Sequence, residues 1–374
     1  MLFLLVCAAL AFGLSLLTVV PVPVRVKWKL AVLAGEYGYK LVAWPLAVIV
    51  ITWITTESPT LLWWITNVVA AVAVACFLKP LFQAKQIARD LPAQLADAFG
   101  ATQPKAAPFA LSELFTRSGA TVRAVTHDYA PGLLLDFYPA IGEQSAPCIV
   151  VIHGGGWDGG DRGEIAHFNA WLAQSGYAVA AIDYRLAPAH PWPAQREDTH
   201  LALAWLKANA TRLGIGADKL VLFGRSAGGQ IAAAVGCTAN DPAIRGIISF
   251  YAPQDMPFAW SVSRADDALN SLQLMRQYLG GPPDETRREI YHSASAQLNV
   301  NSTTPPMLLM HGTLDTLVWR RHSVRMEERL KEAGRPAVFI ELPWATHAFE
   351  YNLAGPGGQL TRFAVRWFID AVTR

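Results

Sequence analysis

Residues 219–230 read Lys-Leu-Val-Leu-Phe-Gly-Arg-Ser-Ala-Gly-Gly-Gln. The first of them form a short apolar strand and the last open an alanine-rich helix, so Ser226 stands in a sharp turn between the two. Gly224 and Gly228 lie two residues to either side, where larger side chains would collide with the neighbouring strand and helix. Such a turn presents a serine instead of burying it. The Gly-x-Ser-x-Gly pattern alone is weak evidence for a catalytic serine, because glycine and serine are common in ordinary turns. The rest of the chain therefore has to supply partners for Ser226.

A glycine-rich loop upstream is the first such partner. The continuous apolar run 148–152 predicts a strand buried on both faces, and it ends in His153-Gly154-Gly155-Gly156. Glycines allow backbone N–H groups to face a cleft, so the N–H groups of Gly155 and Gly156, with that of Ala227, are candidates to bind an oxyanion. We expect His153 to orient this loop through a hydrogen bond. An ordinary flexible turn would not explain why this loop and the serine turn each follow a core strand.

An acid and a base follow further downstream. Asp315 lies in the loop after the apolar strand 306–310, and His347 lies in the loop after the strand 337–342. The chain order is therefore serine, acid, histidine, each at the carboxyl end of a strand, where parallel sheets place their sites. The predicted mechanism is nucleophilic: His347, held by Asp315, takes the proton of Ser226.

Other acids and histidines compete for these roles. Among the nine histidines, only His153, His311 and His347 directly follow predicted strands. We expect Asp183 to be a structural turn residue paired with Arg185. Glu341 is a weaker alternative acid, because it lies inside the last strand.

The order of strands and helices indicates the fold class. From residue 121 onward, strands alternate with helices, which predicts an α/β fold with a doubly wound, mostly parallel sheet and an antiparallel hairpin, 121–126 with 133–138, at one edge. The insertion 252–304 between two core strands is predicted to form a wall or cap over the pocket that holds the acyl group. Three of its apolar residues either line that pocket or form the core of the cap, and we favour the core: Met256, Phe258 and Trp260.

Together these motifs resemble one family. The His153-Gly154-Gly155-Gly156 loop, the run Asp183-Tyr184-Arg185-Leu186-Ala187-Pro188 with Pro193-Ala194 and Asp198 after it, Gly224-x-Ser226-Ala227-Gly228-Gly229 and the Asp315 and His347 loops are similar to those of the hormone-sensitive-lipase-like branch of α/β-hydrolase esterases. The resemblance covers residues 121–374. It implies a serine carboxylic-ester hydrolase acting through an acyl-enzyme, with its site as follows: nucleophile Ser226, acid Asp315, base His347 and oxyanion donors Gly155, Gly156 and Ala227.

Two positions depart from that family. Arg225 stands where it usually has aspartate, and Ala189 stands where it usually has glutamate, which points to neighbouring carboxylesterase or feruloyl-esterase-like groups. Arg225 either meets an anionic group of the substrate or pairs with a structural carboxylate.

The composition bears on other functions, such as binding of nucleic acid or of a metal. A net charge of +2 without a block of lysine or arginine gives no reason to expect a nucleic-acid partner, and the four scattered cysteines lack the spacing of a zinc site. We expect neither a metal nor an organic cofactor, and a small-molecule or lipid ester as substrate. The same triad could also transfer an acyl group to an alcohol or cleave an amide or peptide. The non-enzyme alternative is a binding protein with an inactive hydrolase fold.

The first 80 residues predict a membrane anchor. Three uncharged runs, 2–20, 41–56 and 58–78, are candidates for three transmembrane helices. A cleaved signal peptide is disfavoured, because no basic residue precedes the first run. The alternatives are a helical hairpin that dips into the membrane, or a hydrophobic core packed on the enzyme.

The charges of the connecting loops predict an orientation. Basic residues gather between the first and second runs and after the third, whereas the loop between the second and third holds only Glu57. The catalytic part is therefore expected on the cytoplasmic side of an inner or plasma membrane, with the amino terminus outside. Residues 81–120 are a connector whose helical stretch 81–99 is a membrane-surface helix, a lid at the active-site mouth or a plain linker helix.

Overall fold

A computed structural model describes residues 1–21, 25–103, 106–116, 122–142 and 145–374. Thr121, the predicted start of the catalytic part, lies outside the described residues. The strands are β1 Val125–Ala130, β2 Leu133–Tyr138, β3 Ala146–Ile152, β4 Ala178–Ile182, β5 Ile215–Arg225, β6 Ile244–Phe250, β7 Met307–Gly312 and β8 Ala337–Leu342. The helices are α1 Leu2–Ser15, α2 Arg25–Leu41, α3 Ala43–Thr55, α4 Leu61–Phe99, α5 Ala166–Gln174, α6 Ala194–Ala208, α7 Ala210–Leu213, α8 Ala227–Thr238, α9 Met256–Val262, α10 Ser271–Leu279, α11 Arg288–Ser293, α12 Arg321–Glu332 and α13 Pro356–Val372, with the 3-10 turns η1 Leu16–Thr18 and η5 Phe349–Tyr351.

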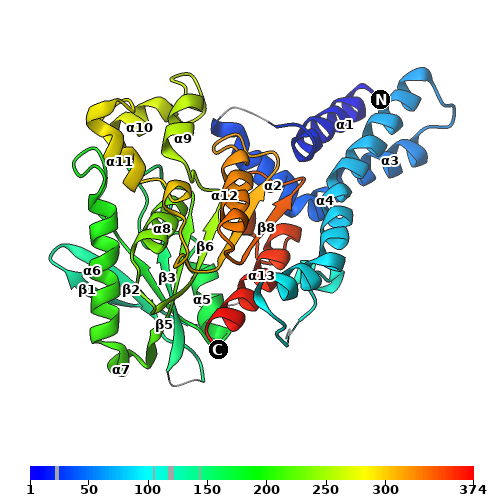
Figure 1. The fold of residues 1–374 in the computed structure, drawn as a ribbon. Helices are drawn as coiled ribbons and strands as arrows, with labels where there is room; N and C mark the ends of the chain where they lie inside the picture. The colour runs from blue at the N-terminus through cyan, green and yellow to red at the C-terminus, as the bar shows by residue number, and fades with distance from the viewer. Residues whose placement is uncertain (22–24, 104–105, 117–121, 143–144) are drawn as a thin grey trace.

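The strands form one sheet in the order β1-β2-β4-β3-β5-β6-β7-β8 (Figure 1). Strand β2 pairs antiparallel with both β1 and β4, and every later pair is parallel. The predicted doubly wound, mostly parallel sheet with an antiparallel hairpin at one edge is therefore confirmed. This topology brings the carboxyl ends of β5, β7 and β8 to the same edge of the sheet.

The two faces of the sheet build two separate layers of core. Because successive side chains of a strand point to opposite faces, Val150 and Ile152 of β3 pack with α6 and α8, whereas Ile149 and Val151 pack with α5 and α13. All four side chains are buried. This alternation explains why the central strands read as continuous apolar runs.

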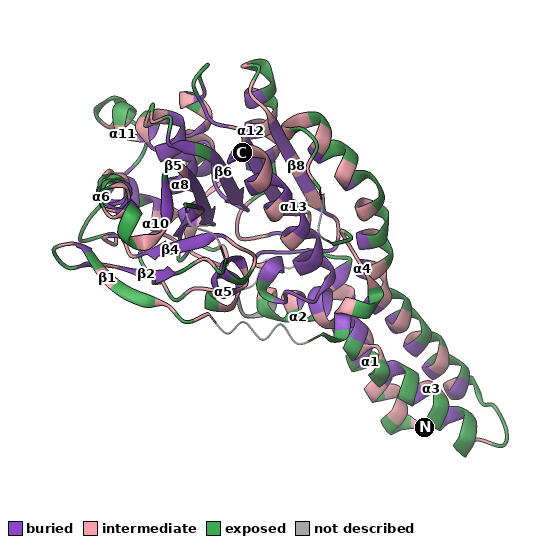
Figure 2. Ribbon diagram, turned by 90° about the horizontal axis from the view of Figure 1, so that it is seen from below, coloured by how far each residue is buried: buried purple, intermediate pink, exposed green. Residues whose placement is uncertain are grey.

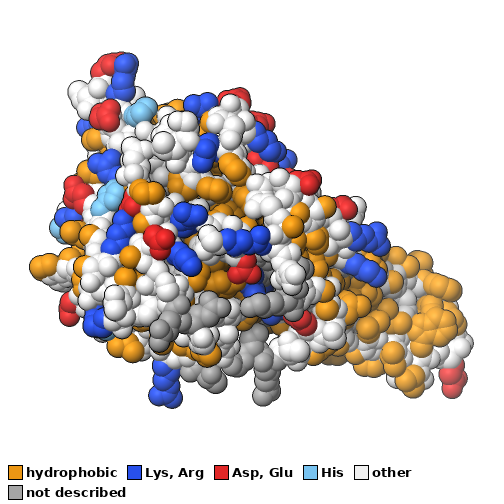
Figure 3. All heavy atoms as spheres, turned by 60° about the horizontal axis from the view of Figure 1, so that its bottom comes forward, with side chains coloured by type: hydrophobic (Ala, Val, Ile, Leu, Met, Phe, Trp, Pro, Cys, Tyr) orange, Lys and Arg blue, Asp and Glu red, His pale blue; other side chains and the backbone are white. Residues whose placement is uncertain are grey.

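An apolar arm projects from the catalytic part (Figures 1 and 2). It consists of α1, α3 and the first half of α4, packed together around small side chains such as Ala8, Ala11, Ala70 and Ala73. Its outer surface is covered by large hydrophobic side chains, and Figure 3 shows it as an almost unbroken apolar surface. Those exposed on it are Leu2, Phe3, Val6, Leu10, Trp44, Leu46, Val50, Ile51, Trp53, Ile54, Leu61, Trp64, Ile65, Val68 and Val72.

The lengths of the arm helices bear on the membrane prediction. Within the described part of the chain, α4 is long and apolar enough to cross a bilayer, and α2 with α3 meets the same test only as one pair bent by 47°. The 13 residues of α3 rise about 20 Å, less than the roughly 30 Å of a bilayer core. The apolar helix Leu2–Thr18 is also shorter than a usual span. Three full crossings therefore stay a prediction.

The connector helix is part of the scaffold. The predicted helix 81–99 is the second half of α4, which runs without a break for 39 residues from its cap at Thr60. Its side chains Ala84, Leu91 and Leu95 are buried in the same core layer as α13 and β8. Its apolar face is therefore occupied by the sheet layer. A different segment, α2, contacts His347, as described below.

Candidate active site

The serine turn has the geometry predicted for it. Ser226 links β5 to α8 with the dihedral angles φ 51° and ψ −121°, a left-handed backbone that side chains rarely adopt. A Cβ atom on Gly224 would lie 2.0 Å from the carbonyl oxygen of Gly228, and one on Gly228 would lie 2.1 Å from that of Ile152. Only glycine fits at these two positions, and their close packing holds the strained serine in place.

The acid and the base are in direct contact. Nδ1 of His347 lies 2.7 Å from Oδ2 of Asp315, and both residues are buried. The other oxygen of Asp315 accepts hydrogen bonds from the N–H groups of Leu317 and Val318, at 2.8 and 3.1 Å. Burial opposes ionisation of Asp315, but His347 and His311 outweigh it and lower the pKa of this carboxyl below its ordinary value. The carboxylate is therefore ionised and orients the imidazole.

Strand β6 connects the serine to the histidine. The N–H group of Ser226 donates to the carbonyl oxygen of Phe250, 3.0 Å away, at the end of β6. The next residue, Tyr251, packs its ring on His347 with the ring centroids 4.2 Å apart. Phe250 and Tyr251 thus bond to the serine turn and pack on His347, respectively.

Ser226 and Asp315 share a cavity of about 690 Å³. Two of the predicted oxyanion donors, Gly156 and Ala227, also line it. One wall comes from the insertion 252–304, which contributes Pro253, Ala259, Val262, Ser263, Arg264, Asp266, Asp267, Leu269, Ser271, Leu274 and Met275. The favoured core role is borne out for Met256, which is fully buried, and for Trp260, which packs against the core.

The glycine loop is held by three neighbours. The N–H of Gly154 donates to Oε2 of Glu164 at 2.8 Å, and Nδ1 of His153 lies 2.7 Å from the carbonyl oxygen of Gly154. The ring of Tyr184 stacks on that of His153 at 4.1 Å. His153 therefore orients the loop, as expected. The N–H groups of Gly155 and Gly156 stay the candidates for binding an oxyanion.

Arg225 pairs with a structural carboxylate, which is the second of the two roles expected for it. It is buried beneath the serine turn, with its guanidinium carbon 4.4 Å from the ring centroid of Phe223, and it does not line the cavity. Its charge pairs with Glu350, which lies three residues after His347 in the 3-10 turn η5.

One predicted ion pair is wrong. Asp183 binds Arg162 at 2.6 Å, and Arg185 binds Asp198 at 2.8 Å instead. Each of the two side chains therefore has its partner on another segment of the chain. Asp183 is nevertheless structural, as expected.

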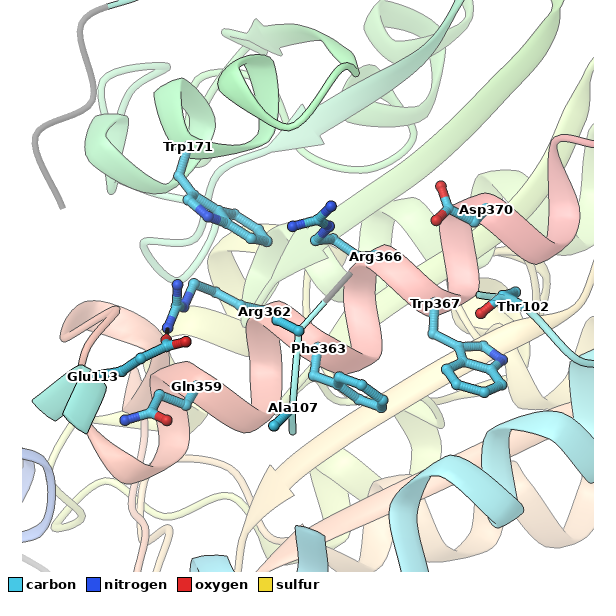
Figure 4. Close-up of a pocket in the computed structure, with 11 residues that line it drawn as sticks. Thr102, Ala107, Glu113, Trp171, Gln359, Arg362, Phe363, Arg366, Trp367 and Asp370 are labelled. Carbon is cyan, nitrogen blue, oxygen red and sulfur yellow. Dashed lines mark hydrogen bonds and ion pairs between the residues drawn. The ribbon is translucent and has the colours of Figure 1, made fainter. Parts of the chain in front are cut away.

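A second cavity lies away from this chemistry. It measures about 40 Å³ and lies where the connector crosses α13 (Figure 4). Its wall includes Arg362, which is paired with Glu113, and Asp370, which accepts a hydrogen bond from Tyr177 at 2.5 Å. Its charged groups stabilise the attachment of the connector. Within the described ranges, no group of three His, Cys, Asp or Glu side chains could hold a metal ion.

Sequence comparisons identify the family and its relatives. A family model described as BD-FAE matches residues 135–330, a range that includes Ser226 and Asp315 and ends before His347. The esterase LipC of Mycobacterium tuberculosis is 28% identical over 268 residues, which are 67% of this chain and 65% of that protein. The probable carboxylic ester hydrolase LipM of the same organism is 29% identical over 243 residues, 61% of this chain and 55% of LipM. The matches thus span about 55 to 65% of the length of these relatives.

Solved structures of similar fold are esterases. The esterase from the archaeon Pyrobaculum calidifontis has a TM-score of 0.59 at 23% identity, covering 77% of this chain and 92% of the other. The esterase LipW from Mycobacterium marinum has a TM-score of 0.58 at 24% identity, covering 79% and 90%. At this identity the likeness establishes the α/β-hydrolase fold.

Proposed function

The chain belongs to the BD-FAE family, and on this premise we propose that it is a serine esterase that hydrolyses carboxylic esters through an acyl-enzyme. The observation that carries the proposal is the 2.7 Å contact between His347 and Asp315, where Asp315 lines the same cavity as the strained Ser226. The names of the relatives LipC and LipM, an esterase and a probable carboxylic ester hydrolase, support the reaction class.

Each site residue then has one role. His347 takes the proton of the Ser226 hydroxyl, and the serine oxygen attacks the ester carbonyl. The N–H groups of Gly155, Gly156 and Ala227 bind the oxygen of the tetrahedral intermediate. His347 returns the proton to the departing alcohol. A water molecule, deprotonated by the same histidine, then releases the acid and restores the serine.

The reaction is tested by labelling and turnover. The full chain should react with a fluorophosphonate probe and hydrolyse a short p-nitrophenyl ester. Ser226→Ala should remove both activities and leave the unfolding curve unchanged. Turnover by the folded Ser226→Ala protein at the wild-type rate would refute the mechanism. A wild-type protein that neither reacts nor turns over would instead support an inactive binding protein.

The apolar arm supports a membrane location. A contiguous apolar surface of this extent is unfavourable in water and is typical of a membrane or partner contact. Hydrogen bonds hold its interior, as from Lys79 Nζ to the carbonyl oxygen of Thr18 at 3.2 Å and from Thr52 to Asn67 at 3.0 Å. The side chains of Met1 and Thr56 are in contact, at 3.7 Å. Both lie at the far end of the arm, which fits an embedded arm with its tip away from the catalytic part.

The membrane proposal has its own test. The full chain should float with liposomes of neutral phospholipid, in high salt as well as in low salt. A cysteine at Glu57, near the tip, should be shielded from an impermeant maleimide when the reagent is on the cytoplasmic side of sealed inverted vesicles. A chain that stays soluble without detergent would contradict the anchor. Because the anchor keeps the cavity near the bilayer, we expect lipid or membrane-partitioned esters as substrates; equal turnover of soluble and vesicle-borne esters would argue against this.

A further inference from the structure

Helix α2 leaves the arm and packs on the catalytic part, outside the proposed membrane segments. It carries Glu36, which is 1% exposed. Oε1 of Glu36 accepts a hydrogen bond from Nε1 of Trp344 at 3.0 Å, and Oε2 accepts one from the N–H of Gly357 at 2.8 Å. The backbone oxygen of Glu36 accepts from Nδ2 of Asn352 at 2.7 Å. Three donors from the segment 344–357, which includes the first turn of α13, therefore converge on a single residue of α2.

That segment is the one that carries the catalytic base. Trp344 precedes His347 by three residues, and Asn352 and Gly357 follow it. Glu36 thus accepts hydrogen bonds from residues before and after the histidine. The contact is close, since a Cβ atom on Gly357 would lie 2.6 Å from Oε1 of Glu36.

Glu36 also completes the start of α13. This helix begins with Pro356, and its own N-cap residue, Gly355, makes no side-chain capping bond. The carboxyl of Glu36 binds the N–H of Gly357 in the first turn, where a helix favours an anion or another acceptor. Burial raises the pKa of Glu36 to about 8, but in either protonation state its oxygens can accept these hydrogen bonds.

A second residue of α2 reaches the base itself. The ring of Trp28 meets the imidazole of His347 edge to face, with centroids 6.3 Å apart and planes at 84°. Tyr251 packs on the imidazole at 4.2 Å. Pro21, just before α2, lines the catalytic cavity together with Ser226. The amino-terminal region therefore lines the cavity and contacts the base.

We propose that α2 is a working part of the active site, in which Glu36 and Trp28 are positioning residues for His347. Glu36 fixes the loop, and Trp28 limits the rotation of the imidazole while it is bound to Asp315. The proposal rests on the proposed function, because it concerns the base of that reaction. It predicts that the amino-terminal region is required for turnover as well as for membrane attachment.

The test separates turnover from the amount of folded enzyme. Each full-length variant is purified in detergent, its active sites are counted with a fluorophosphonate, and kcat and KM are measured per labelled site. Glu36→Ala should lower kcat at least tenfold with KM within twofold of wild type, and Glu36→Gln, which keeps one acceptor, should recover part of the loss. Asp90→Ala, on the exposed surface of α4, is the matched control and should behave like wild type.

A second pair of variants covers the case in which Glu36→Ala fails to fold. Trp28→Ala should lower kcat about fivefold, and Trp28→Phe, which keeps a ring edge, should lose less than twofold. If Glu36→Ala and Trp28→Ala both match Asp90→Ala per labelled site, the positioning role is refuted.

A signal that does not depend on turnover separates the two proposals. The downfield proton resonance of the His347–Asp315 hydrogen bond should be present in wild type and broadened or lost in Glu36→Ala. A shift of this signal in a protein without esterase activity would refute the proposed function and keep the positioning role. An unchanged signal in the variant would refute the positioning role.

Discussion

The Nε atom of Arg225 lies 3.0 Å from Oε1 of Glu350, and the two side chains are 1% and 0% exposed. The same carboxylate oxygen accepts a hydrogen bond from the hydroxyl of Tyr251, whose ring contacts His347, the proposed base. A buried network thus joins the residue before the nucleophile to the loop of the base. It explains why a cation is tolerated beneath the serine.

Arg225→Met is expected to destabilise the protein. The change keeps the apolar stem but leaves Glu350 as a buried carboxylate without its cation, a change that typically costs about 3–5 kcal/mol. The midpoint of chemical unfolding should fall accordingly. Arg264→Met is the matched control, since that arginine belongs to an ion pair on the surface and its loss should leave the midpoint unchanged. Equal midpoints for the two variants would contradict the role of the network.

Asp315→Asn should nearly abolish turnover. An amide at this position favours the wrong tautomer of His347, and the equivalent change in a serine protease lowers kcat about ten-thousandfold. His311 also faces Asp315, at 3.4 Å, but its other ring nitrogen bonds to Ser323. We therefore expect His311→Gln to lose less than tenfold in kcat. Comparable losses in the two variants would show that the acid acts through both histidines.

Glu164 should influence turnover through the glycine loop. Glu164→Ala removes the acceptor for Gly154 and should lower kcat roughly tenfold, less than the hundred- to thousandfold typical when an oxyanion donor itself is lost. Glu164→Gln keeps an acceptor oxygen and should stay within threefold of wild type. Steady-state kinetics on a p-nitrophenyl ester measures both. Full activity of Glu164→Ala would mean that the loop is held without it.

Stability should fall in acid because of His322. This residue is 2% exposed, and burial lowers its pKa to about 3. The histidine of an unfolded chain has a pKa near 6.5. Between about pH 6.5 and pH 3 the unfolded state therefore binds a proton at this position that the folded state does not bind, and stability is lost as the pH falls through this range. The free energy of unfolding should drop by a few kcal/mol over this window. His322→Gln should flatten the slope, and an identical slope would exclude His322 as its source.

The mostly parallel sheet, its antiparallel edge hairpin, the serine turn and the positions of Asp315 and His347 after strands could all be predicted from local sequence. Each depends on a short signal: an apolar run, a glycine at a turn, a polar residue after a strand. Glu164 follows the glycine loop closely, but nothing in the sequence marks it as the acceptor for Gly154.

The contacts that the sequence did not reveal are those between distant segments. Glu36 meets Trp344 across 308 positions, and Arg225 meets Glu350 across 125. No local pattern identifies the partner of a buried charge, because the partner is chosen by the packing of the whole sheet layer. For the same reason the sequence left the role of 81–99 open between a membrane-surface helix, a lid and a linker helix, and it did not mark α2 as the segment that contacts His347.

The continuity of α4 has a mechanical consequence. Its 39 residues rise about 58 Å, and one end belongs to the apolar arm while the other is buried beside α13. With the arm embedded as proposed, no flexible hinge separates the bilayer from the sheet. The catalytic cavity is then held at a constant height and tilt above the lipid surface. The enzyme therefore meets substrates in a thin layer next to the membrane and not throughout the volume of the cell.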